Sequence, residues 1–90
     1  MKLYTAFARY FATGEGMTHM VVVSYAQDEE DIKKKFADHF SAYMAIGVEI
    51  HEGIVEQELV LTGPILESLR RSEAKQGWID YYAQLHVNFS

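Results

Sequence analysis

The chain has 90 residues, of which 49% are hydrophobic, and its 8 basic and 13 acidic side chains give a net charge of −5 at neutral pH. This length and apolar content are sufficient for one small domain, residues 1–90, with its own hydrophobic core. The negative charge argues against a nucleic-acid partner, because the protein would repel phosphates at long range. The absence of cysteine excludes disulfides, thiol nucleophiles and thiolate metal sites.

No segment approaches the roughly 20 apolar residues that are needed to span a bilayer. Arg9 interrupts the first apolar run, which is too short for the hydrophobic region of a secretory signal. We therefore expect a cytoplasmic protein that does not bind a membrane.

The first 26 residues have the pattern of a β-hairpin. Residues 3–11 are dense in aromatic side chains, which suit a half-buried strand better than a helix. Residues 13–16 contain two glycines that can adopt positive φ, and residues 18–26 continue with a β-rich pattern around a run of three valines. These segments predict two antiparallel strands joined by a tight turn.

A helix is predicted to begin at Asp28, whose carboxylate can accept hydrogen bonds from the free N–H groups of the first turn. The next three residues are acidic, as the helix dipole favours at an N-terminus. The helix should end between residues 45 and 47. Apolar side chains then form one stripe at spacings of three and four: Ile32, Phe36, Phe40, Tyr43 and Met44.

Residues 46–51 alternate between apolar and other side chains, which predicts another strand. Glu52 and Gly53 have the composition of a tight turn, so residues 54–61 are either a return strand or a loop. Thr62 is a candidate cap for a second helix, with Pro64 tolerated in its first turn and Gly77 suited to end it in a left-handed conformation.

The tail, residues 78–89, fits two templates. Its apolar residues alternate as in a strand, but residues 78–85 also have helical spacing. We favour the strand, because alternation accounts for more of the residues and the end of the chain is β-branched and aromatic.

Together these elements predict an α+β fold. We expect a two-layer sandwich with a mainly antiparallel sheet of four or five strands, in the order β-β-α-β-(β)-α-β, and with two helices on one face. If Ala6 and Ala8 face the helices, the alternation of side chains sets the composition of the open face. It would then carry Thr5, Phe7, Arg9, Phe11, Glu49 and His51, joined by Gln84, His86 and Asn88 from the tail.

No pattern in the chain is specific for a catalytic or ligand-binding function. Glu49 and His51 lie two residues apart and share a strand face, which permits proton transfer, but no nucleophile stands in a recognisable elbow sequence. The four histidines lack the spacing of a helix-borne metal site. We therefore expect no metal and no cofactor.

Five phenylalanines, six tyrosines and one tryptophan are difficult to bury completely in one small domain. Some of these rings are expected on a contact surface, and Arg9 can stack on its aromatic neighbours while holding a carboxylate. Trp78, with its neighbouring tyrosines, fits either a core or an interface. The candidate interaction surface comprises Phe7, Arg9, Phe11, Glu49, His51, Trp78 and His86.

These features favour a non-enzymatic protein–protein interaction module. We expect a homodimer that uses the open sheet face or a sheet edge, with another protein as a further partner. The alternative is a small-ligand-binding protein or a modest enzyme with a pocket between subunits. There, Arg9 would hold an anion and His51 or His86 would transfer a proton.

Overall fold

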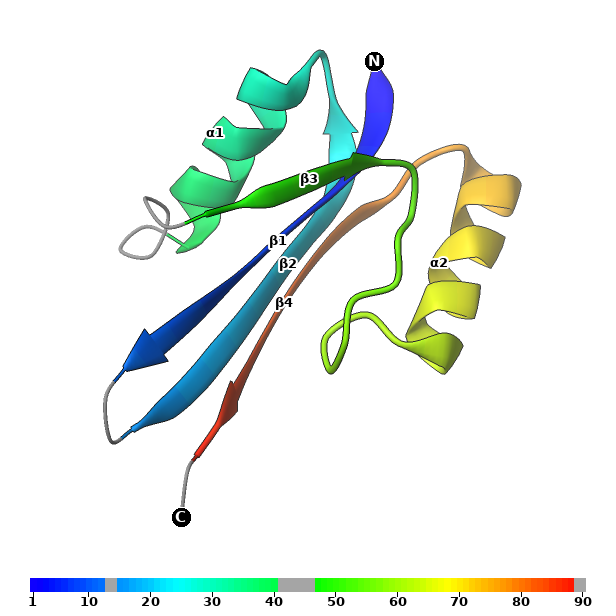
Figure 1. Ribbon diagram of the computed structural model, residues 1–90. Helices are drawn as coiled ribbons and strands as arrows, with labels where there is room; N and C mark the ends of the chain where they lie inside the picture. Colours follow the sequence, from blue (N-terminus) through cyan, green and yellow to red (C-terminus); the bar gives the residue numbers. More distant parts are fainter. Residues whose placement is uncertain (13–14, 41–46, 89–90) are drawn as a thin grey trace.

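The computed structural model describes residues 1–12, 15–40 and 47–88. Within these ranges a single antiparallel sheet has the strand order β3-β1-β2-β4, and two helices connect its strands (Figure 1). The elements in chain order are β1 (Lys2–Ala12), β2 (Gly16–Ala26), α1 (Glu29–Phe40), β3 (Glu49–Glu52), α2 (Gly63–Gln76) and β4 (Asp80–Val87).

The predicted hairpin is confirmed. β1 and β2 pair along their whole length, from Lys2 opposite Ala26 to Ala12 opposite Gly16. β3 pairs only with the first half of β1, and β4 pairs with β2 as the opposite edge of the sheet. The hairpin and β4 extend well past both helices (Figure 1). One end of the sheet therefore lies beyond the reach of α1 and α2.

α1 covers the face of the sheet that carries the even-numbered residues of β1 and β2, here called the α1 face. Ile32, Phe36 and Phe40 point into this face and are buried, as their spacing predicts. The small side chains of Ala6 and Ala8 let the helix approach closely. The other buried members of this cluster are Tyr4, Met20, Val22 and Ala26.

α2 lies over the opposite face, which carries the odd-numbered residues of the same strands and is here called the α2 face. Leu66 and Leu69 of α2 are partly buried against it, beside the segment 54–61. The buried members of this second cluster are Phe7, Val21, Val23, Val60, Leu61 and Ile79.

The α+β class, the antiparallel sheet and the order of the elements are confirmed, with four strands rather than five in the described residues. The expectation that both helices cover one face is corrected, because α1 and α2 pack against opposite faces. The physical reason lies in β2, where Met20 to Val23 are all 0% exposed. Successive residues of a strand point to opposite faces, so this run requires a cover on each side.

α1 begins as predicted. The Asp28 carboxylate accepts a hydrogen bond from the Asp31 N–H at 2.9 Å, and the Asp31 carboxylate accepts one from the Gln27 N–H at 3.0 Å. These reciprocal bonds satisfy N–H groups that have no partner inside the helix. The predicted end of the helix at 45–47 and the predicted start of the next strand at Ile46 involve residues outside those described. β3 occupies Glu49–Glu52.

Of the two alternatives for residues 54–61, the loop is correct. It closes on itself through paired backbone hydrogen bonds of 2.8 Å between Gln57 and Leu61, and Leu59 has a positive φ of 73°. The Thr5 hydroxyl anchors the start of this segment, because it donates to the Gly53 carbonyl at 2.7 Å and accepts from the Val55 N–H at 3.0 Å.

α2 follows Thr62, whose side chain makes no capping hydrogen bond, so the predicted side-chain cap is not formed. Gly77 ends the helix at φ 70°, and its N–H donates to the Glu73 carbonyl at 2.8 Å, as predicted. The tail is a strand over Asp80–Val87, which decides between the two templates. None of the helices among the described residues is long and apolar enough to cross a membrane.

Candidate interaction surface

The end of the α2 face near the hairpin turn carries apolar side chains that α2 does not cover. Directly opposite residues of antiparallel strands share a face, so the registers define rows of neighbours. One row consists of Arg9, His19 and Leu85. The next row, closer to the hairpin turn, consists of Phe11, Met17 and Val87. We call this second row together with Leu85 the distal patch.

Three of the four residues of the distal patch are exposed to solvent. Phe11 is 53%, Leu85 41% and Val87 36% exposed, whereas Met17 is half-buried. Single exposed apolar side chains are common on protein surfaces, but a contiguous group on three strands is typical of an interaction site. The distal patch therefore has the composition and position of a contact surface.

His19 lies beside the distal patch and is only 6% exposed. Its Nδ1 atom has no hydrogen-bond partner among the described residues. A buried polar group without a partner typically costs about 1–3 kcal/mol. The α2 face thus contains an unsatisfied nitrogen in the row between Arg9 and Leu85.

Two opposite charges border the distal patch. Arg9 on β1 and Glu49 on β3 are both exposed, and neither forms an ion pair or a hydrogen bond with another described residue. Glu49 lies opposite Phe7, which places it diagonally from Arg9 on the same face. Together they line a hollow of about 340 Å³. Neither His51 nor His86 is among the described residues that line this hollow.

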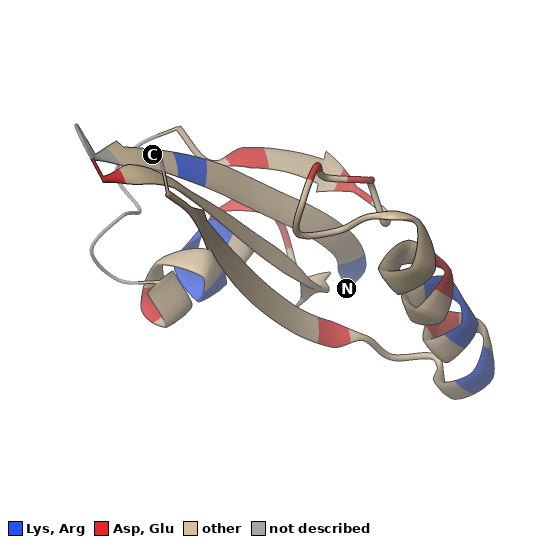
Figure 2. Cartoon of the chain, turned by 90° about the horizontal axis from the view of Figure 1, so that it is seen from below, with Lys and Arg blue, Asp and Glu red and all other residues tan. Residues whose placement is uncertain are grey.

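β4, the edge strand that contributes Leu85 and Val87 to the distal patch, has little charge. Figure 2 shows most acidic and basic residues on the helices and around β3, whereas β4 carries the single charged residue Asp80. Edge strands that avoid pairing with other chains commonly carry lysine, proline or a bulge, and β4 has none of these in its continuous pairing with β2.

The predicted surface residues near β3 share one face as expected, but this face is not open, because α2 packs against part of it, and not all of these residues are exposed. Phe7 is 8% exposed and belongs to the core, so it is not available for contact. The exposed His51 ring stacks on Phe7 at a centroid distance of 5.7 Å. No hydrogen bond joins Glu49 to His51 in the described structure, so the Glu49 carboxylate does not orient the His51 ring.

Trp78 lies away from the distal patch. It is 49% exposed and stacks on Tyr25 at a centroid distance of 4.5 Å. Tyr25 pairs with Leu3, at the end of the hairpin farthest from its turn. Trp78 is therefore separate from Arg9 and Phe11.

His86 lies on the α1 face. The expectation that Gln84, His86 and Asn88 share a face with Arg9 is therefore wrong for Gln84 and His86, the two that belong to β4. The register pairs Thr18 with His86 and Met20 with Gln84. His86 Nε2 lies 3.0 Å from the Glu15 carbonyl and must donate to it, which leaves Nδ1 of the neutral ring to accept from the Thr18 hydroxyl at 2.9 Å. These bonds occupy both ring nitrogens.

Among the described residues, no three histidine, aspartate or glutamate side chains are grouped so that they could hold a metal ion. Compared with models of protein families, with curated protein sequences and with solved structures, the chain matches none of them. The molecule is a small α+β protein with a partly uncovered apolar sheet face, and this geometry is what bears on its function.

Proposed function

We propose that this protein is a non-enzymatic protein–protein interaction module that acts in the cytoplasm and forms a homodimer through the distal patch. The observation that supports this most strongly is the exposure of Phe11 on β1 and of Leu85 and Val87 on β4, with Met17 of the intervening β2 between them, beyond the part of the sheet that α2 covers. An interface of this kind gains free energy from removing apolar surface from water.

A second copy of the chain is the partner that the charges favour. A two-fold interface brings the same patch together from both protomers, so each border charge can meet the partner's opposite charge. Arg9 of one protomer would pair with the partner's Glu49, and the symmetry repeats this pair. The distal patch itself contains no acidic residue, so the net charge of −5 is not concentrated where the protomers meet.

Replacement of a patch residue by serine tests the proposal. We expect native protein to behave as a dimer in light scattering across a concentration series, and Leu85→Ser and Phe11→Ser to shift the equilibrium toward monomer by at least roughly tenfold in Kd, because each removes buried apolar surface. Ile65→Ser, which removes a similarly exposed side chain on α2, is the matched control and should leave Kd unchanged.

A native protein that is monomeric over the whole series would contradict the proposed homodimer. A dimer that withstands both serine substitutions would contradict this contact surface instead.

A further inference from the structure

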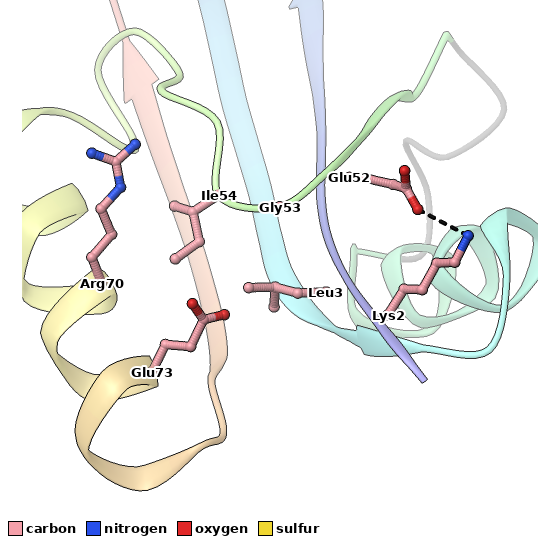
Figure 3. A pocket seen from close by; sticks show the side chains of 7 residues that line it. All are labelled: Lys2, Leu3, Glu52, Gly53, Ile54, Arg70 and Glu73. Carbon is pink, nitrogen blue, oxygen red and sulfur yellow. Dashed lines mark ion pairs between the residues drawn. The ribbon is translucent and has the colours of Figure 1, made fainter.

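A second hollow, of about 510 Å³, lies between α2, the start of β1 and the turn that follows β3. Its volume falls within the range of pockets that hold small molecules. Figure 3 shows Arg70 and Glu73 extending from α2 on one side, the paired Lys2 and Glu52 on the other, and apolar side chains between them. It is separate from the distal patch, because no residue of that patch lines it.

The floor of this cleft is apolar. Leu3 and Ile54 are partly buried and pack against the cluster of buried residues beneath α2. Gly53, between the two walls, has a positive φ of 81°, and no atom lies within 4 Å of the place that a Cβ would occupy. An apolar group of a ligand could therefore contact the floor without obstruction from the turn.

The charged groups of the cleft differ in how they are already engaged. Lys2 Nζ lies 3.0 Å from Glu52 Oε1, and the Tyr25 hydroxyl donates to Glu73 Oε2 at 3.3 Å. Burial and the Glu73 carboxylate raise the pKa of Tyr25, so its hydroxyl keeps the proton that it donates. Arg70 has neither an ion pair nor a hydrogen bond with another described residue, although Glu73 is three positions away.

The free guanidinium of Arg70 is the strongest available recognition group in the cleft. Its planar fork matches the two oxygens of a carboxylate. The Glu73 and Glu52 carboxylates retain acceptor positions for an ammonium group, and they would repel a doubly charged phosphate. Two cationic and two anionic lining residues give a net charge of zero, which suits a ligand that carries one charge of each sign.

We propose that this cleft binds a free α-amino acid with an apolar side chain. The ligand carboxylate pairs with Arg70, its ammonium group lies against Glu73, and its side chain rests on Leu3 and Ile54. This inference goes beyond the proposed dimer and does not depend on it.

The proposal can be tested by titrating the full-length protein with L-leucine and following backbone amide signals by NMR. We expect saturable shifts around Gly53 and Ile54. N-acetyl-L-leucine, which lacks the ammonium group, and L-leucinamide, which lacks the carboxylate, should each bind at least roughly tenfold more weakly, because each loses a charge-assisted hydrogen bond.

Two neighbouring arginines provide matched variants. Arg70→Ala should weaken leucine binding by roughly tenfold or more, whereas Arg71→Ala, which removes the same charge from a residue outside the cleft, should leave it unchanged. The dispersion of the amide spectrum checks that each variant is folded. The proposal is overturned if leucine gives no saturable shift, if leucinamide binds as well as leucine, or if the two arginine variants behave alike.

Discussion

At the scale of single residues, the two histidines of the β2–β4 ladder differ in how their ring nitrogens are satisfied. His19 is buried on the α2 face and its Nδ1 has no partner among the described residues. The exposed His86 lies on the α1 face and both its nitrogens are hydrogen-bonded, to Thr18 and to the Glu15 carbonyl. The sequence shows two similar histidines in β-rich segments, and only the register of the strands distinguishes them.

The difference predicts opposite effects of the same substitution. His19→Phe removes an unsatisfied buried nitrogen and should leave the free energy of unfolding unchanged or raise it by about 1 kcal/mol. His86→Phe removes two hydrogen bonds and should lower it by about 1 kcal/mol. Urea denaturation of both variants in a Phe11→Ser background measures this in the monomer. A larger loss for His19→Phe than for His86→Phe would refute this interpretation.

At the scale of elements, α1 and α2 are attached to the sheet very differently. α1 buries Ile32, Phe36 and Phe40, whereas no residue of α2 is fully buried. α2 is held by partly buried leucines and, through Tyr25, by the Glu73 hydrogen bond and the Trp78 stack. Elements with few buried apolar contacts open locally at a lower free-energy cost than the core.

Hydrogen exchange should reveal this difference. Amides in the middle of α2 are expected to exchange at least roughly tenfold faster than those of β2 and of α1, because α2 can detach without disrupting the core. Tyr25→Phe, which removes the hydrogen bond to Glu73, should accelerate exchange in α2 alone. Equal protection of both helices would contradict weak docking of α2.

Local patterns in the sequence were sufficient to predict most elements, because the deciding interactions are local. Asp28 caps α1, and Gly77 ends α2 in a left-handed conformation. The sequence of residues 54–61 is ambiguous, because the turn composition of Glu52 and Gly53 also suits a return strand. The residues themselves do not signal the bridge between Gln57 and Leu61 or the positive φ of Leu59, a conformation that leucine rarely adopts.

At the scale of the whole molecule, the contact surface was predicted only in part. Arg9, Phe11 and Glu49 lie at or beside the distal patch as the alternation of β1 and β3 predicts. The sequence alone does not place Leu85 and Val87 on this face, because a shift of one residue in the pairing of β4 exchanges the two faces of the strand. The covering of both faces was likewise missed, although the continuous apolar run in β2 signals it.

In the proposed dimer, two copies of this chain meet through the distal patch and its border charges. A charge-exchange cycle in sedimentation equilibrium tests it most directly, using native protein, Arg9→Glu, Glu49→Arg and the double variant. Each single change should raise the dimer Kd by roughly tenfold, because two attractive pairs become repulsive, and the double variant should return toward the native value. If the two single changes raise Kd additively in the double variant, or if the native protein remains monomeric, the proposed interface is wrong.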